Sequence, residues 1–331
     1  MLQRLQNLKV LNLSRSQRLT GMPHFSNVSN LVKLNIAFCE SLQKVDLSFG
    51  SLKQLTSLDL SGCRKIRSLP STIQHLVSLE YLNLSDCSNL ETFPEINEYM
   101  ECLKNLDLSR TCIKKLPSSI EFLNHLFFLE LEGCENLSCL PNSICWLKSL
   151  SYLSLRNCSN LETFPEIMDD MKCLKDLDLG GTGIKELPSS IGYVNHLNYL
   201  SLKQCKNLSR LPSSIGRLKL LMYLHLGGCP NLVTADMENL TKLGLSETQN
   251  LSSLVGLDLS RNDMRHIPAA ITQLCNLRYL NISHCNMLEE IPELPSSLRE
   301  IDAHDCASLG NLSNPSTLLW SLLKWLKKVQ V

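Results

Sequence analysis

A phrase rich in leucine recurs along nearly the whole chain, and it constrains the fold more than any other feature. Its clearest copy begins at Leu150 and follows the pattern L-x-x-L-x-L-x-x-C-x-x-L-x-x-[LF]-P. Ten successive copies begin 23 or 24 residues apart, and four less regular copies follow. The fourteen copies begin at Leu8, Leu31, Leu55, Leu79, Leu103, Leu126, Leu150, Leu174, Leu197, Leu221, Leu240, Leu254, Leu277 and Leu298. This self-similarity predicts a stack of repeats, each in contact with its neighbours.

The leucines within each copy predict how a repeat folds. Those at pattern positions 1, 4 and 6 point inward, whereas positions 3, 5 and 7 point outward from a short strand. Burying one leucine stabilises the fold by roughly 1.5–3 kcal/mol, but a single repeat has nothing to bury it against. We therefore predict an α/β leucine-rich-repeat solenoid, a horseshoe with parallel strands on its concave face. Short helices, 3-10 turns and loops are expected on the convex face.

The convex side should contain two kinds of segment after the Leu-Pro step. Five repeats continue with Ser-Ser-Ile or a close variant, and we expect these serines to cap a short helical turn. Two repeats instead carry Glu-Ile-x-x-x-Met, at residues 95–100 and 166–171, which predicts a slightly longer helix. The ten letters CSNLETFPEI at 87–96 recur unchanged at 158–167, so a block of three repeats was copied in tandem. Copying of this kind extends a binding surface and is rarely how an active site is built.

Fifteen cysteines are present, and nine of them share pattern position 9. The nine are Cys39, Cys63, Cys87, Cys134, Cys158, Cys205, Cys229, Cys285 and Cys306. The other repeats carry Ser16, Thr111, Thr182, Thr248 and Asn262 there, so every member can donate a hydrogen bond. We expect a structural cysteine ladder, in which these donors satisfy buried backbone carbonyls that lack partners. No Cys-x-x-Cys pair supports zinc binding, and reduced thiols favour the cytoplasm, with the nucleus as an alternative.

The domain organisation follows from where the pattern holds. We predict one solenoid of about 14 repeats over residues 1–310, with an irregular stretch at 236–256. That stretch is either a degenerate repeat or a hinge or contact feature. Residues 311–331 are expected to form a helix that covers the last repeat or links to a further domain. A membrane-surface or calmodulin-target helix is the alternative there.

Composition narrows the classes of function. Lysine plus arginine and aspartate plus glutamate both number 32, so the chain lacks the basic footprint of a nucleic-acid binder. We expect no signal peptide, because residues 1–7 lead directly into the first repeat, and no apolar run is long enough to span a membrane. Gly180–Lys185 only imitates a phosphate-binding loop, and the eight histidines show no metal-ligand spacing. We therefore expect no catalytic residues, no cofactor and no metal.

The outward strand positions are the most informative surface. Pattern position 3 carries five of the seven tyrosines, and position 5 carries carboxylates without any lysine or arginine. The predicted protein-binding residues are Tyr81, Phe128, Tyr152, Tyr199, Tyr223, Tyr279, Asp107, Glu130, Asp178 and Asp258. Aromatic side chains beside acidic ones are typical of protein interfaces, and here they favour a partner with basic or polar groups. The alternative is that tyrosine is simply a good strand residue on a half-exposed sheet.

Particular phrases extend this interpretation. The Leu-Pro-Ser-Ser-Ile steps, CSNLETFPEI and the stretch DLSRTCIKKLP at 107–117 resemble the C-terminal repeats of plant intracellular nucleotide-binding leucine-rich-repeat immune receptors of the Toll/interleukin-receptor type. The resemblance covers about residues 8–310. It implies that the repeats sense a pathogen effector or a guarded host protein and help to hold the receptor inactive against its own nucleotide-binding domain. The NAD-cleaving and nucleotide-binding domains of that family lie upstream, so we expect this chain to be a fragment or truncated product without those activities.

The sequence thus predicts a non-enzymatic protein-recognition module of a plant disease resistance receptor. A free-standing repeat adaptor, such as a substrate adaptor for a ubiquitin ligase, is the alternative, although no F-box accompanies the repeats. A secreted receptor would need a signal peptide and the asparagine version of the ladder, which only Asn262 provides.

Overall fold

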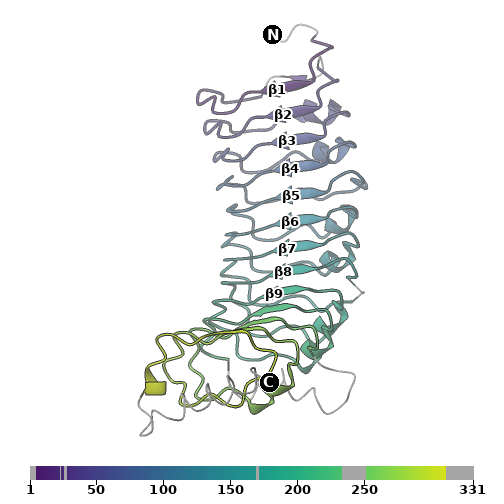
Figure 1. Ribbon diagram of the computed structural model, residues 1–331. Coiled ribbons are helices and arrows are strands. Elements are labelled where there is room, and N and C mark those ends of the chain that lie inside the picture. The colour runs from purple at the N-terminus through teal and green to yellow at the C-terminus, as the bar shows by residue number, and fades with distance from the viewer. Residues whose placement is uncertain (1–4, 23, 26–27, 169–170, 233–250, 311–331) are drawn as a thin grey trace. The chain divides into compact units, whose positions relative to one another are not determined.

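Strands of three residues recur at pattern positions 3 to 5 and stack in chain order (Figure 1). The computed structural model describes residues 5–22, 24–25, 28–168, 171–232 and 251–310. These residues form two compact units, the first comprising residues 1–161 with 171–174 and the second residues 162–170 with 175–331. Within the described ranges the regular elements are strands and 3-10 helices, without an α-helix. This is the predicted leucine-rich-repeat architecture with its convex helices reduced to 3-10 turns.

The first unit contains seven strands, each parallel to the next and paired residue for residue. They are β1 (Val10–Asn12), β2 (Lys33–Asn35), β3 (Ser57–Asp59), β4 (Tyr81–Asn83), β5 (Asn105–Asp107), β6 (Phe128–Glu130) and β7 (Tyr152–Ser154). Equivalent pattern positions therefore lie side by side in neighbouring repeats. A residue type that recurs at one position forms a continuous column along the sheet.

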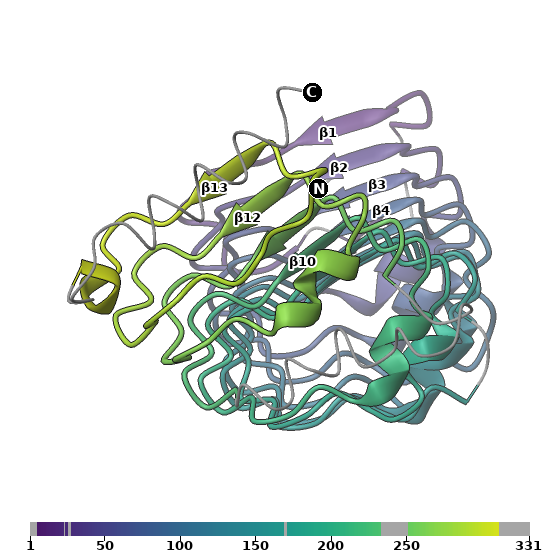
Figure 2. The same cartoon turned by 60° about the horizontal axis from the view of Figure 1, so that its bottom comes forward.

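The second unit contains six strands with the same parallel pairing (Figure 2). They are β8 (Asp176–Asp178), β9 (Tyr199–Ser201), β10 (Tyr223–His225), β11 (Gly256–Asp258), β12 (Tyr279–Asn281) and β13 (Glu300–Asp302). Strand β10 pairs directly with β11, Tyr223 opposite Gly256. The repeat expected to begin at Leu240 falls between these two strands, and the count of about fourteen stays a prediction. Leu240 itself lies outside the described residues.

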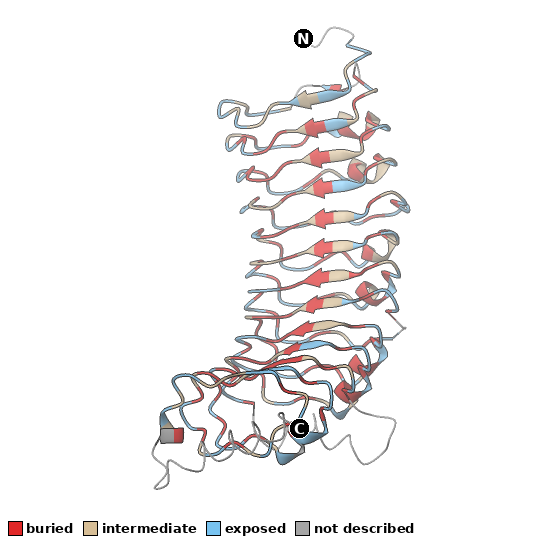
Figure 3. Cartoon of the chain, in the orientation of Figure 1, coloured by how far each residue is buried: buried red, intermediate tan, exposed pale blue. Residues whose placement is uncertain are grey.

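The leucines face inward as predicted. In the repeat that begins at Leu150, the side chains of Leu150, Leu153 and Leu155 are at most 1% exposed. In β2 to β12 the middle residue of each strand is buried, and the residue before it is intermediate or exposed in all of these strands but β11 (Figure 3). The period-2 alternation of a strand thus separates a leucine core from an outward strand face, defined here as pattern positions 3 and 5.

Short 3-10 helices follow the strands in several repeats, and in the first unit they lie on the opposite side of the repeat from its strand (Figure 1). In the first unit they are η2 (Leu47–Ser51), η3 (Ser71–His75), η4 (Ile120–Phe122) and η5 (Asn142–Trp146). In the second unit they are η6 (Ile191–Tyr193), η7 (Ser213–Arg217), η10 (Ala269–Gln273) and η11 (Ala307–Gly310). Each Ser-Ser-Ile segment or variant does form such a turn.

The expectation that the serines cap these turns is wrong. Helices η3, η5 and η7 begin on the first residue of the segment, so a proline stands at the N-cap. Ser119 and Ser190 do occupy N-cap positions, but neither hydroxyl bonds to its own helix. Both hydroxyls bond to the neighbouring repeat instead. A side-chain cap is present at η2, where Asp46 accepts from the backbone N–H of Ser48 at 2.8 Å.

The longer helix expected at 95–100 is also wrong, because that segment contains no helical residue. The Glu95 carboxylate accepts hydrogen bonds from the backbone N–H and hydroxyl groups of both Ser118 and Ser119. The Ser119 hydroxyl oxygen in turn accepts from the backbone N–H of Ile96 at 2.7 Å. These bonds to the next repeat replace the bonds that a helix would make within the segment.

The copied block has the same arrangement. Glu166 accepts from Ser189 and Ser190, and the Ser190 hydroxyl oxygen accepts from Ile167 N at 2.6 Å. Residues 166–168 are accordingly not helical, and 169–170 lie outside the described residues.

Two further expectations fall on residues that the structure does not describe. These are the C-terminal helix in 311–331 and most of the irregular stretch, up to residue 250. Within the described ranges, no helix has the length and apolar character needed to cross a membrane.

Candidate protein-binding face

Most described strands end in a turn closed by the strand's own position 5 side chain. The Asp107 carboxylate accepts from the backbone N–H of Ser109 at 2.9 Å, and Asn83 accepts from Ser85 at the same distance. Asp178 accepts from Gly180 at 2.8 Å, so the arrangement occurs in both units. Asp and Asn favour such turns because their short side chains reach the backbone two residues ahead. The carboxylates at pattern position 5 therefore close these turns, a structural role that the repeat pattern did not reveal.

A left-handed residue follows at pattern position 8. In all thirteen repeats with a described strand this residue has a positive φ, between 55° and 73°. Four are glycines and the rest include Asn157 and Asp86. The conformation turns the chain inward and aims the backbone N–H at the next repeat. Asp86 N, for example, donates to the Ser109 carbonyl at 2.8 Å.

Nine cysteine thiols connect neighbouring repeats. Each Sγ donates to the position 6 carbonyl of the preceding repeat, at 3.1–3.3 Å. We expected these carbonyls to have no other partner, and for some of them this is wrong. Leu131 O, for example, accepts from Cys134 N at 3.1 Å as well as from the Cys158 thiol at 3.2 Å. Burial raises the pKa of Cys63 and of Cys87 to about 12, so both thiols stay protonated.

The replacements at position 9 donate differently. The Thr111 hydroxyl bonds to the carbonyl of Leu108 in its own repeat at 2.8 Å and lies 3.3 Å from Cys134 Sγ. The Asn262 amide donates to the carbonyls of both Leu226 and Leu259, at 2.9 and 2.8 Å. Its longer side chain therefore bridges β10 and β11, the strand pair joined by the irregular connection. Thr248 lies outside the described residues.

The six predicted aromatic residues all lie at pattern position 3, which is the first residue of a strand, and none is in the leucine core. Tyr81, Tyr223 and Tyr279 are 37–44% exposed, and the other three are half-buried. In the first unit the rings of Phe128 and Tyr152 stack in parallel with centroids 4.3 Å apart. An aromatic column of this kind presents rigid apolar surface beside polar groups.

The four predicted carboxylates differ in how accessible they are. Asp107, Glu130 and Asp178 are half-buried, whereas Asp258 is 7% exposed. Asp258 lies 3.6 Å from His225 Nδ1 and accepts from Ser260 N at 2.9 Å. Burial acts to raise the pKa of Asp258, but the hydrogen bonds from His225 and Ser260 lower it to about 2. The Asp258 carboxylate therefore already has partners within the sheet and is not available to bind another protein. Burial raises the pKa of Glu130.

One hollow on the strand face lies between two tyrosines of the second unit. Gly256 separates Tyr223 from Tyr279 along the position 3 column, and a Cβ there would come within 2.7 Å of Tyr223 Cδ1. The missing side chain leaves a hollow of about 290 Å³, whose lining includes Glu300 and Asp302. Glycine is thus required at this position for the two rings to flank an open space.

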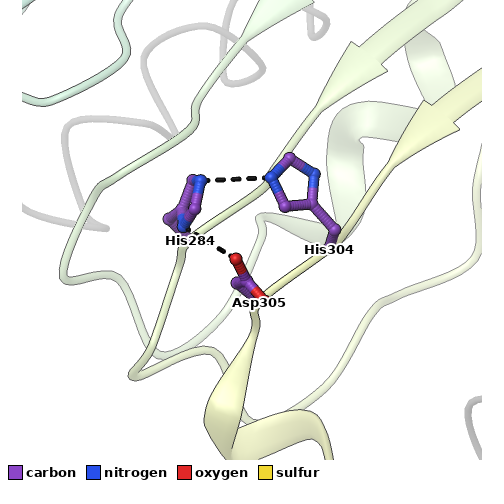
Figure 4. A group of neighbouring side chains, drawn as sticks. All are labelled: His284, His304 and Asp305. Atoms are coloured by element: carbon purple, nitrogen blue, oxygen red, sulfur yellow. Dashed lines mark hydrogen bonds and ion pairs between the residues drawn. The ribbon is translucent and has the colours of Figure 1, made fainter.

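The structure also brings together residues that the sequence did not connect. His284, His304 and Asp305 form a cluster at the last two described strands (Figure 4). They come from positions 8, 7 and 8 of adjacent repeats, so their proximity follows from stacking and not from local spacing. Aligning the repeats before searching for ligand sets would have found them.

Comparison with known proteins agrees with this geometry. Residues 146–243 match the family described as "Disease resistance protein RPS4B-like, leucine-rich repeats", and residues 98–180 and 236–288 match other leucine-rich-repeat families. The chain is a leucine-rich-repeat protein related to plant disease resistance proteins. The leucine-rich-repeat protein is 45% identical to the disease resistance-like protein DSC1 of Arabidopsis thaliana over 69 residues. It is 46% identical to the TMV resistance protein N of Nicotiana glutinosa, also over 69 residues.

These matches cover only part of each protein. They span 21% and 20% of the leucine-rich-repeat protein and 6% of each relative's own length. Among solved structures, it is similar to YopM, a leucine-rich effector protein from Yersinia pestis, with a TM-score of 0.61 and 25% identity. That similarity covers 88% of this chain and 70% of YopM.

Proposed function

We propose that this chain is the protein-recognition module of a plant disease resistance receptor and that the strand face binds its partner. The hollow between Tyr223 and Tyr279 is the observation that supports this most directly. Its two rings are exposed, its floor is a glycine, and its edge includes the carboxylates of Glu300 and Asp302. Exposed aromatic residues around a recess are typical of interface hot spots.

The partner of this hollow would present a lysine or arginine side chain. Aromatic rings attract a cation through their faces, and nearby carboxylates add a Coulombic contribution. Asp258 is excluded from this role because its carboxylate already bonds to His225 and Ser260. The carboxylate of Asp302 is likewise bonded, to His304, so the specificity rests on the two tyrosines and on Glu300.

The wider biological role is inferred from the similarity to plant disease resistance proteins. In this proposal the ligand is a pathogen effector or a guarded host protein, and the repeats contribute to autoinhibition by contacting the receptor's own nucleotide-binding domain. The site of action is the cytoplasm or the nucleus. The proposal needs binding alone and no reaction by this chain.

A displayed library of random peptides, panned against the full chain, tests the binding face. We expect enriched peptides to contain lysine or arginine and to bind Tyr223→Ala and Tyr279→Ala on the order of tenfold more weakly. Gly256→Leu should abolish binding by filling the hollow. Tyr193→Ala is the matched control, because Tyr193 is 54% exposed but lies on η6 instead of a strand. Peptides that bind the Tyr223, Tyr279 and Gly256 variants as tightly as they bind the native chain and the Tyr193 control would refute the proposal.

A further inference from the structure

Two histidines and an aspartate from adjacent repeats converge beyond the ends of β12 and β13. The ring atoms His284 Nε2 and His304 Nε2 are 3.1 Å apart, and His284 Nδ1 is 3.5 Å from Asp305 Oδ2 (Figure 4). One potential ligand atom from each residue lies within 4.8 Å of the other two. The cluster is therefore compact enough to surround a single ion.

The backbone holds these residues in place. His284 and Asp305 both occupy the left-handed position 8, with φ values of 58° and 55°. His284 N donates to the His304 carbonyl at 2.9 Å, which fixes the separation of the two turns. The side chains thus start from a backbone set by repeat stacking, and such preorganisation reduces the cost of assembling a ligand set.

A second carboxylate determines which nitrogen of His304 is available. Asp302 Oδ1 is 2.6 Å from His304 Nδ1, and an ionised carboxylate can only accept, so Nδ1 carries the hydrogen. The unprotonated Nε2 then points at His284 Nε2. The carboxylate of Asp305 lies on the other side of the His284 ring, 3.5 Å from Nδ1. In the metal-free protein an Nε2–H of His284 can donate to this His304 lone pair at 3.1 Å, and a cation that replaces the hydrogen would be held by both Nε2 atoms.

We propose that His284 and His304 bind a divalent transition-metal ion of the zinc class through their Nε2 atoms, with Asp305 as a third ligand. Zinc–nitrogen bonds of about 2.0–2.1 Å place two ligands of a tetrahedron about 3.4 Å apart, so the rings need to separate by only a few tenths of an ångström. Asp305 is 71% exposed at its side chain and can turn toward the ion without repacking.

The surroundings fit this assignment. A ligating histidine usually donates its other ring N–H to a carboxylate, and Asp302 takes that place behind His304. Imidazole with carboxylate suits zinc better than calcium or magnesium, which prefer oxygen ligands alone. The side chains of His284 and His304 are 33% and 57% exposed, so solvent reaches the site and a water can fill the fourth position. Bound metal would tie the two repeats together at this end of the second unit.

Calorimetric titration of the full chain with zinc chloride tests the site. We expect one equivalent to bind the native chain, and saturable binding to be lost in both His284→Ala and His304→Ala. Asp302→Asn should bind about 10–100-fold more weakly, because it removes the carboxylate that orients His304. His266→Ala is the matched control, since His266 is also exposed and lies 3.7 Å from Glu290 but outside the cluster.

Exposed cysteines such as Cys139, Cys173 and Cys275 could also hold zinc, so the titration is repeated with cobalt(II). We expect a visible spectrum without a thiolate-to-cobalt charge-transfer band. Far-UV circular dichroism and gel filtration show whether each variant is folded. The proposal is overturned if either histidine variant binds zinc as tightly as the native chain, if the native chain binds none, or if the cobalt spectrum shows thiolate ligands.

Discussion

Cys158 donates its thiol hydrogen to the carbonyl oxygen of Leu131, one repeat earlier in the chain, across 3.2 Å. The same bond recurs at eight other cysteines, so one donor at one pattern position joins successive repeats. Leu131 O also accepts from a backbone N–H, and the thiol therefore supplies its second hydrogen bond. Because the carbonyl keeps one hydrogen bond without the thiol, removing the thiol should lower the free energy of unfolding only modestly.

Cys158→Ala should lower the free energy of unfolding by about 1 kcal/mol, the usual net value of one hydrogen bond. The carbonyl keeps its backbone partner, so the full cost of an unsatisfied buried group does not apply. Cys158→Ser should lose less, because the hydroxyl still donates. Chemical denaturation measures both variants, and Cys139→Ala, at an exposed cysteine, serves as the control. An alanine variant as stable as the native chain would show that the thiol only fills space.

Thiol alkylation should separate the two classes of cysteine. Burial raises the pKa of Cys63 from 9.0 to about 12, which reduces its reactive thiolate about a thousandfold at a given pH. Iodoacetamide at pH 8, followed by mass spectrometry of the peptides, should therefore modify Cys139, Cys173 and Cys275 well before any of the nine ladder cysteines. Denaturant should remove the difference. Ladder cysteines that react as fast as Cys275 in the native protein would contradict the inward orientation.

Features that belong to a single repeat could be predicted from the sequence. The pattern placed Tyr81 and Asn83 on the outward side of a strand and Leu82 in the core, and the structure agrees. Alternation of apolar residues along a strand is enough for that inference, because each side chain's direction depends only on its own backbone.

Contacts between individual side chains of two repeats that do not recur at one pattern position were not predicted. Glu95 suits a helix by local propensity, yet its carboxylate is held by Ser118 and Ser119, which lie 23 and 24 residues ahead. The His284–His304 contact likewise spans 20 residues. Helix propensity differs by only a few tenths of a kcal/mol per residue, so contacts from the neighbouring repeat decide the outcome.

The position 5 carboxylates close turns and are also predicted to bind a partner, and variants of Asp107 can separate these two roles. Asp107→Asn keeps the oxygen that accepts from Ser109 N, so its stability should change by less than about 0.5 kcal/mol. Asp107→Ala removes the acceptor and should cost about 1 kcal/mol. Denaturation measures the stability of both variants, and peptide binding is measured beside it. A stable asparagine variant with weakened binding would assign the charge to recognition. Equal stability of the alanine and native proteins would refute the structural role.

Asp258 should make the second unit sensitive to acid. Its pKa falls from 3.8 to about 2 on folding, chiefly because the bonds from His225 and Ser260 outweigh the effect of burial. A carboxyl group with a lowered pKa stabilises the folded state above its unfolded pKa, so this contribution is complete at pH 5 and is lost as the pH falls toward 2. The shift corresponds to about 2 kcal/mol. Urea denaturation between pH 5 and 2.5 should show a shallower acid decline for Asp258→Asn, and a smaller reduction for His225→Ala, which removes one of the two donors. An acid decline identical in Asp258→Asn and the native chain would mean that this carboxylate titrates alike in the folded and unfolded states.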